Sequence, residues 1–174
     1  KEAINHVGDR FGLPNGWLNA DFTHTDSYSH RIGEFSKPYR TFNQVLNVRI
    51  VTGEYLIAMK LRSGRQYKND LSDVLGILAE HEKRGEPILF ERIKIAVDHL
   101  YGHWESLPTE SSVFIENAFS RGNFQKAYAS IRQAEQDAKT MLLDFEQQYP
   151  GTIKEENVNE ILNHLKPNKD TILQ

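Results

Sequence analysis

Residues 54–73 read EYLIAMKLRSGRQYKNDLSD, and this stretch decides how the chain is expected to fold. At 100° per residue, the apolar side chains of residues 55–61 surround nearly the whole circumference of a helix, which predicts a helix buried on all sides. Lys60 falls among these apolar groups. Its ammonium must reach water or an anion, because an unpaired buried charge is very costly. The sequence therefore predicts a central helix with one lysine that needs a partner.

Two carboxylates follow this lysine on the next expected helix, residues 70–83. Asp70 lies within the arc of apolar residues on that helix, and Asp73 lies at the margin of the arc. If residues 63–69 form the turn between two packed helices, Lys60 and Asp70 can meet. The structural interpretation, without any function, is that Asp70 is an N-cap with an acid three residues later, or that it forms a purely structural ion pair. Composition and spacing alone favour this structural interpretation.

The functional interpretation uses the same residues together with nearby basic ones. Residues 60–69 contain no acid but carry Lys60, Arg62, Arg65 and Lys68. A buried lysine beside one or two carboxylates, joined by such a basic cluster, would suit a phosphate-bearing substrate. We therefore take Lys60, Asp70 and Asp73, with the other three cations, as candidate residues of a site for such a substrate, in which the cations would bind the phosphate.

One strand and several helices make up the expected secondary structure. Residues 44–52 (QVLNVRIVT) predict a strand, whose partner strands must come from residues 12–40, from another chain or from sequence before Lys1. Residues 12–40 read as a long structured loop. Apolar spacing predicts helices over residues 2–11, 54–62, 70–83, 89–104, 109–120, 123–148 and 154–165. We expect an α/β part with an incomplete sheet over residues 1–85, then an acidic all-α helical bundle over residues 86–174, with helix dominating overall.

Composition bounds the function further. The chain has 174 residues and no cysteine, which excludes disulfides, thiolate zinc sites and a cysteine nucleophile. Its mean hydropathy is −0.59 and no apolar run approaches a membrane span, so we expect a soluble cytoplasmic protein. The net charge of −3 divides into +3 over residues 1–70 and −6 over residues 71–174. An anionic ligand should favour the first part, whereas an acidic chain without a basic stripe is a poor general nucleic-acid binder.

The longest expected helix carries an apolar heptad seam. Such seams serve antiparallel bundles or dimers. We therefore expect residues 123–148 to bind either a second copy of the chain or a partner protein. The seam consists of Phe124, Ala127, Ile131, Ala134, Ala138, Met141 and Phe145. His99 and His103 are the only helical histidine pair, and packing or surface roles suit them better than a metal site, so we expect no metal ligands in this chain.

The stretch NVRIVT, then EYLIAMKL, an arginine and a turn bearing Asp70 and Asp73, resembles the second half of bacterial nucleotidyltransferase-like proteins related to abortive-infection toxins. GLPNGWLN, residues 12–19, resembles the linker of an uncharacterised branch of that group. The resemblance covers residues 10–80. It implies that Lys60 and Asp70, with Asp73 as second choice, occupy active-site positions, and that the intact protein uses Mg²⁺ and a nucleoside triphosphate.

The chain departs from this family in one respect that matters for catalysis. The superfamily holds its Mg²⁺ on two carboxylates one residue apart after a Gly-Ser or Gly-Gly turn, and no such element occurs here. Either the metal-binding half was removed before Lys1, or the protein is a degenerate relative that keeps the scaffold. We therefore expect a portion of a nucleotidyltransferase-fold protein that would transfer a nucleotide to RNA, protein or a small acceptor when intact and is inactive as this chain. The alternative is a non-catalytic helical interaction module in a toxin–antitoxin or phage-defence complex.

Overall fold

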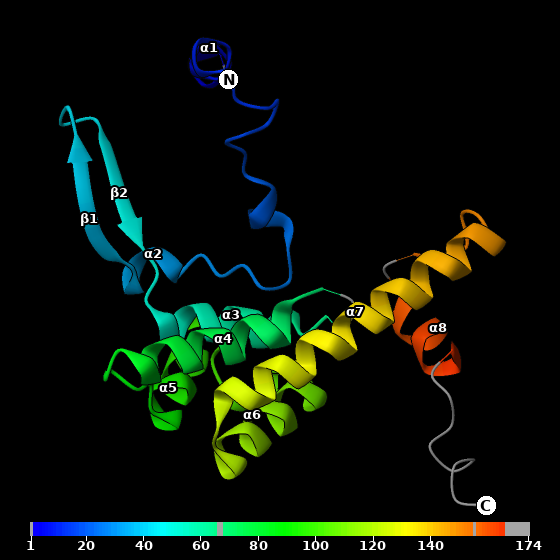
Figure 1. Cartoon of the computed structure of the whole chain (residues 1–174). Helices are drawn as coiled ribbons and strands as arrows, with labels where there is room; N and C mark the ends of the chain where they lie inside the picture. The colour runs from blue at the N-terminus through cyan, green and yellow to red at the C-terminus, as the bar shows by residue number, and fades with distance from the viewer. Residues whose placement is uncertain (1, 66–67, 155, 166–174) are drawn as a thin grey trace, which may run out of the picture.

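The computed structural model describes residues 2–65, 68–154 and 156–165, and helices dominate it. A small two-stranded sheet lies in the N-terminal part and the helical body follows it (Figure 1), as the sequence predicts. The elements are α1 (Glu2–Phe11), η1 (Asp21–His24), α2 (Ile32–Phe35), β1 (Lys37–Phe42), β2 (Leu46–Ile50), α3 (Gly53–Ser63), α4 (Asp70–Lys83), α5 (Phe90–Tyr101), η2 (Trp104–Ser106), α6 (Thr109–Arg121), α7 (Phe124–Gln148) and α8 (Val158–Leu165).

Helix α3 is the centre of the helical body. No residue of this helix is exposed, and Ile57, Ala58 and Leu61 are completely buried. It packs against α4, α5 and α6. The sequence predicted a helix buried on all sides, but only Ile57, Ala58 and Leu61 are buried and the others are half-buried, so the prediction holds only in part.

One hydrophobic core joins the helices around α3. Its buried side chains come from α3, α4, α5 and α6, and include Val74, Leu78, Ile93, Val97 and Ile115. The boundary expected near residue 85 falls between α4 and α5, and helices on both sides of it contribute to this one core.

The predicted strand is present as β2, and its partner is β1. The two strands pair antiparallel, with Phe42 opposite Leu46 and Lys37 opposite Ile50. The partner thus comes from residues 37–42, at the end of the loop that sequence reasoning offered as one source. Because side chains alternate along a strand, Leu46, Val48 and Ile50 share one face with Phe42. That face is largely exposed, since Leu46 is 60% and Ile50 is 48% accessible.

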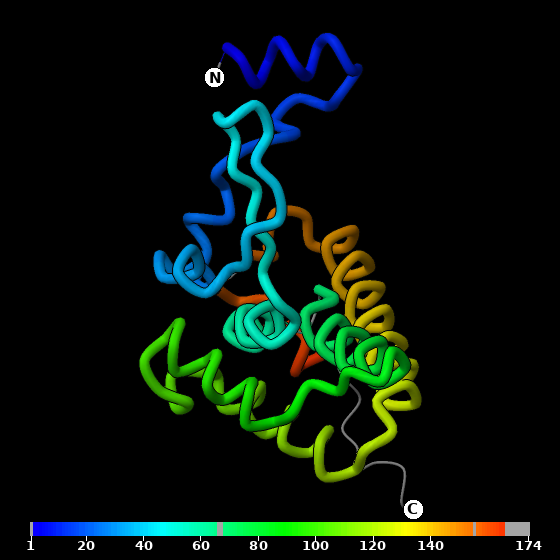
Figure 2. The backbone as a smooth tube through the Cα atoms, turned by 90° about the vertical axis from the view of Figure 1, so that its left-hand side faces the viewer, coloured from blue at the N-terminus to red at the C-terminus, as the bar shows by residue number. Residues whose placement is uncertain are grey.

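The segment before the hairpin projects from the helical body beside it. Figures 1 and 2 both show α1 away from the other helices, with the hairpin extending from the same side of the body. Trp17 donates from its indole nitrogen to the Ile4 carbonyl and so holds α1 against its own following loop. Ser29 donates to the Leu100 carbonyl, and Tyr101 donates to the Ser27 carbonyl, which anchors the far end of this segment on α5.

Helix α7 lies along α4, and its apolar face is used within the chain. Ser72 of α4 is bonded to Glu135 of α7, and Gly76, one turn later in α4, lies nearest to the ring of Tyr128, earlier in α7. The two helices therefore run antiparallel. Farther along, Ala138 and Leu142 pack with α8 in a second small core. Of the predicted seam residues, only Ala138 is buried and Ala134 is exposed, so the buried face of α7 is displaced from the seam. The helix nevertheless pairs antiparallel with α4 within the chain.

Two predicted helix bounds need correction. The helix expected over residues 89–104 ends at Tyr101, because Gly102 adopts a φ of 93° and a 3-10 turn follows over Trp104–Ser106. The helix expected over residues 154–165 begins at Val158, and residue 155 of that prediction lies outside the described residues. Within the described part of the chain, no helix combines the length and the apolar character that a membrane crossing requires.

Gly64 ends α3 in the left-handed conformation, with φ 54°, and a Cβ built there would lie 2.4 Å from Ser111 Oγ. We predict that Gly64→Ala lowers the free energy of unfolding by more than the roughly 1 kcal/mol that a left-handed alanine costs. Gly85→Ala is the matched control, because Gly85 has φ 74° but nothing within 4 Å of its Cβ position. Urea denaturation of both variants tests this, and equal losses would contradict the close approach to Ser111.

Candidate functional site

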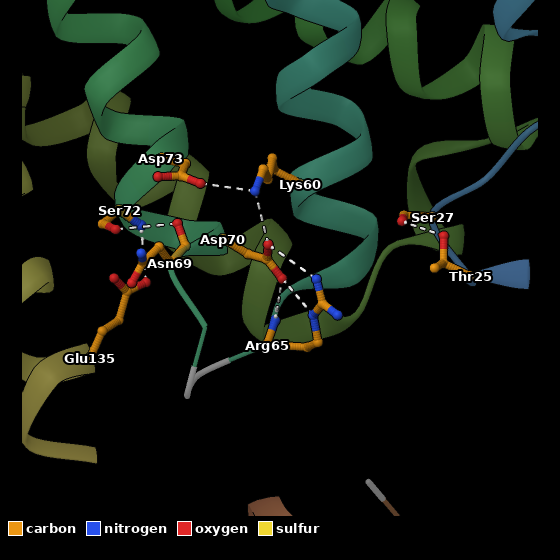
Figure 3. Close-up of polar contacts among 9 residues, drawn as sticks. All are labelled: Thr25, Ser27, Lys60, Arg65, Asn69, Asp70, Ser72, Asp73 and Glu135. Carbon is orange, nitrogen blue, oxygen red and sulfur yellow. Dashed lines mark hydrogen bonds and ion pairs between the residues drawn. The ribbon is translucent and has the colours of Figure 1, made fainter. Parts of the chain in front are cut away.

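The candidate site lies where α3 ends and α4 begins. Lys60 stands in the last turn of α3, and Asp70 is the first residue of α4. Gly64 ends α3 in the left-handed conformation, and the last turn of α3 lies beside the first turn of α4 (Figure 3). The turn that the sequence predicted over residues 63–69 thus brings Lys60 to Asp70, although residues 66 and 67 of it lie outside the described part.

Lys60, Asp70 and Asp73 form a connected ion-pair network (Figure 3). The Lys60 ammonium donates to Asp73 Oδ2 at 2.8 Å and to Asp70 Oδ1 at 3.2 Å. Arg65 donates to Asp70 Oδ2 through its Nε at 2.9 Å and through its backbone amide at 3.3 Å. The three residues that the sequence selected as catalytic candidates therefore meet, and Arg65 joins them.

Burial is unequal across this network. The Asp70 side chain is only 2% exposed, whereas those of Lys60, Arg65 and Asp73 are 30%, 31% and 41% exposed. Asp70 is thus a buried anion with two cations around it. A buried carboxylate is tolerated only when it is paired and hydrogen-bonded, and both of its oxygens meet this condition.

The ion pairs shift the titration of both central groups. Burial alone would raise the pKa of Asp70, but the Arg65 and Lys60 contacts outweigh it and hold that pKa below its usual value. Burial likewise acts to lower the pKa of Lys60, but hydrogen bonds to Asp73 and Asp70 outweigh it and raise the pKa. Both groups are therefore charged throughout the neutral range.

The network borders open space rather than closed packing. A pocket of about 730 Å³ lies beside it, which we call the Lys60 pocket. It is lined by Lys60, Arg65, Lys68, Asn69, Asp70, Asp73, Lys139, Leu142, Leu143, Glu146 and Ile153. A second hollow of about 530 Å³ also includes Lys60 and Asp73 among its lining residues.

The helix-cap interpretation of Asp70 is wrong in detail. The N-cap of α4 is Asn69, whose side chain makes no capping hydrogen bond, and Asp70 is already helical. The free amide of Ser72 instead donates to Glu135 Oε1 at 3.1 Å, so that α7 caps α4 from 63 residues away (Figure 3). Asp70 is thereby released from capping and pairs with the cations of α3 and the turn.

Glu135 is a residue that sequence reasoning missed. It is only 5% exposed, and its second oxygen, Oε2, has no hydrogen-bond partner among the residues that the structure describes. Burial raises the pKa of this carboxyl, and the hydrogen bond from Ser72 opposes that rise in part. The signal in the sequence was an acid between Ile131 and Ala138, inside an otherwise apolar stripe.

The predicted ligand-binding cations separate into two groups. Arg65 and Lys68 line the Lys60 pocket. Arg62 does not line it, because its guanidinium donates to the Ser106 carbonyl and lies over the Tyr101 ring at 5.7 Å. Lys139 of α7 lines the pocket and was not predicted. The basic cluster seen in the sequence therefore loses one member and gains another from a distant helix.

Metal ligation finds little support in the donors that the chain offers. Among the described residues, no group of three or more histidine and acidic side chains is arranged to hold a metal ion. The Asp70 and Asp73 carboxylates are already ion-paired, so the Mg²⁺ implied by the resemblance does not fit the described donors. His99 hydrogen-bonds Tyr55 and stacks on Phe35, which is a packing role.

Asp70 also gives a pH-dependent prediction. Because its folded pKa lies below its unfolded value, the stabilisation that it supplies is present above the ordinary aspartate pKa and is lost as the pH falls through the lowered one. Asp70→Asn should remove this acid dependence and cost on the order of 1–3 kcal/mol at neutral pH, since Lys60 and Arg65 lose a charged partner.

The measurement is urea denaturation of both proteins at several pH values. Glu80→Gln is the control, because Glu80 forms an exposed ion pair with Arg84, and its removal should change stability little. An Asp70→Asn variant as stable as the parent, with the same acid dependence, would contradict the ion-pair role.

The comparisons with known proteins add no family and no function to this geometry. No family model, no curated protein and no solved structure matches this chain.

Proposed function

We propose that the Lys60 pocket binds the phosphate groups of a nucleotide, and that this chain is part of a bacterial cytoplasmic nucleotidyltransferase-fold protein. In intact form that protein would transfer a nucleotide from a nucleoside triphosphate to an RNA, protein or small-molecule acceptor. The observation that carries the proposal is the position of Lys60, held by two carboxylates at the edge of an open pocket lined by other cations.

The charge arrangement supports phosphate binding. Four cations line the pocket, Lys60, Arg65, Lys68 and Lys139, and they come from α3, the following turn and α7. Asp70 is buried behind Lys60 and Arg65, so it orients them while exposing almost none of its own charge. Cationic donors held in place by a buried acid suit an oxyanion ligand with several oxygens.

Donor counting gives Lys60 room for a ligand. An ammonium carries three N–H donors, and Asp70 and Asp73 use two of them. The third is available to a phosphate oxygen, whose charge Lys60 would neutralise. Asp70 then acts as a positioning residue that fixes Lys60. Because the described donors do not fit the implied Mg²⁺, we assign phosphate binding to this chain and not the transfer step.

Lys60→Met tests the proposal, since methionine keeps an apolar stem of similar length and removes the charge. We predict that calorimetry with ATP shows binding by the parent chain and at least about tenfold weaker binding by this variant, the loss of one charge-assisted contact. Arg62→Gln is the matched control: Arg62 is two residues away on the same helix but lies outside the pocket.

Circular dichroism on each variant establishes that the fold is kept. ATP affinity that is unchanged in Lys60→Met, or lowered equally in Arg62→Gln, would count against phosphate binding at this pocket.

A second candidate function is a non-catalytic interaction module of a toxin–antitoxin or phage-defence complex. The observation that favours it is the exposed apolar face of the hairpin, with Leu46 and Ile50 both about half accessible or more. Pairing through residues 123–148 would have to use the outer surface of α7, because its inner face already packs on α4 and α8.

If the hairpin mediates self-association, we predict a mass that rises with protein concentration in sedimentation experiments and that Leu46→Lys returns to that of a monomer. Val113→Lys is the control, because Val113 is a similarly exposed apolar residue on α6. A parent chain that sediments as a strict monomer at every concentration would exclude a homodimer.

A further inference from the structure

A second pocket lies where α6 ends and α7 begins, and we call it the α6–α7 pocket. Its volume is about 650 Å³, and its described lining comes from α4, α6, the start of α7 and the two residues that join α6 to α7. None of its described lining residues also lines the Lys60 pocket. It is therefore a separate feature of the molecule, which the proposed function does not use.

The floor of the α6–α7 pocket is apolar. Leu75 of α4 and Ala118 of α6 lie buried beneath it. Phe114 of α6 and Ile131 of α7 are half-buried, so part of each apolar surface is open to a ligand. Covering such surface releases water and favours the binding of an apolar group. The volume also falls within the range of sites for organic ligands, roughly 300–1,000 Å³.

The charged part of the lining is entirely positive. Arg121, the last residue of α6, and Lys126, in the first turn of α7, line the pocket, and no carboxylate among the described residues does so. Neither side chain has an ion-pair partner in the part of the chain that the structure describes. The Lys60 pocket differs, because its cations share the lining with Asp70, Asp73 and Glu146.

Helix stability accounts for one of these two cations and not for the other. Arg121 stands at the carboxyl end of α6, where the helix dipole favours a positive charge. Lys126 stands in the first turn of α7, which contains no acid and where the backbone amides already carry partial positive charge. A bound anion would relieve this like-charge arrangement. Unpaired cations beside an accessible apolar floor therefore favour a ligand that carries both a negative charge and an apolar body.

We propose that the α6–α7 pocket binds an organic anion of the fatty-acid type, with its apolar body on the pocket floor and its carboxylate beside Arg121 and Lys126. Phe114 and Ile131 supply the surface that the body covers. An inorganic anion would leave this surface wet, and an uncharged apolar molecule would leave both cations unpaired. The inference goes beyond the proposed function, since it assigns a different class of ligand to a pocket that does not contain Lys60.

Three probes separate the contribution of the charge from that of the apolar body. Octanoate carries both, octanamide has the same chain without the charge, and acetate has the charge without the chain. Calorimetry on the parent chain should detect octanoate, find octanamide about tenfold weaker, and find no measurable binding of acetate. The tenfold difference is what two partly solvated ion pairs contribute together.

The variant Arg121→Gln with Lys126→Gln tests the charged end of the site. It should weaken octanoate binding by about tenfold and leave octanamide binding unchanged. The matched control is Arg92→Gln with Arg132→Gln, which removes two exposed positive charges that do not line the pocket. This control keeps the overall charge equal between the two variants and should bind octanoate as the parent does.

Ser130→Glu tests the same end by adding a carboxylate. Ser130 is exposed and lines the pocket, whereas its neighbour Ala129 is exposed and does not, so Ala129→Glu is the control. Only Ser130→Glu should weaken octanoate, because the new charge repels the ligand inside the pocket. Lys60→Met should bind octanoate as the parent does, which separates this site from the Lys60 pocket.

Three outcomes would overturn the inference. The first is a parent chain that does not bind octanoate or binds octanamide equally well. The second is an unchanged octanoate affinity when Arg121 and Lys126 are both replaced by glutamine. The third is an equal loss in the matched control, which would show that overall charge and not the pocket attracts the anion. Circular dichroism on each variant establishes that a lost affinity does not come from a lost fold.

Discussion

The buried carboxylate of Asp70 is the constraint on which the site depends. With 2% of its side chain exposed, this anion must have cations at contact distance, and Lys60 and Arg65 supply them. Those contacts fix the end of α3 against the start of α4. The same contacts hold two cationic side chains at the edge of the pocket, so one electrostatic requirement sets both the local fold and the candidate chemistry.

A second acid, Glu135, accepts a hydrogen bond from the start of α4 and so leaves Asp70 to its ion pairs. The start of α4 needs acceptors for its free amides, and an aspartate in its first turn is a natural candidate for that task. Because Glu135 reaches Ser72 from α7, Asp70 can turn to Lys60 and Arg65 instead. The two acids differ accordingly: ion pairs lower the pKa of Asp70, whereas burial raises that of Glu135. Helix α7 thus shapes the site twice, through this cap and through the pocket wall.

Sequence reasoning succeeds where one local pattern decides the outcome. The apolar residues around the whole circumference of α3 predict its central place, and the spacing of Lys60, Asp70 and Asp73 predicts their contact. It fails where the outcome depends on distant packing. Arg62 belongs to the same basic run as Arg65, yet the Ser106 carbonyl and Tyr101 draw it to the other side of α3. Glu135 and Lys139 lie more than sixty residues after the turn, and only the antiparallel contact of α7 with α4 places them near it.

The exposed hairpin poses a different physical problem from the pocket. A two-stranded sheet gains little stability by itself, and in the described part of the chain this one leaves an apolar face exposed and the outer edges of both strands without a neighbouring strand. Residues 35–53 carry Lys37, Arg40 and Arg49 and no acid, so the hairpin presents positive charge beside its apolar face. The hairpin precedes the first residue of α3 and the Lys60 pocket lies at the last turn of α3, so this helix separates the exposed apolar face from the candidate site.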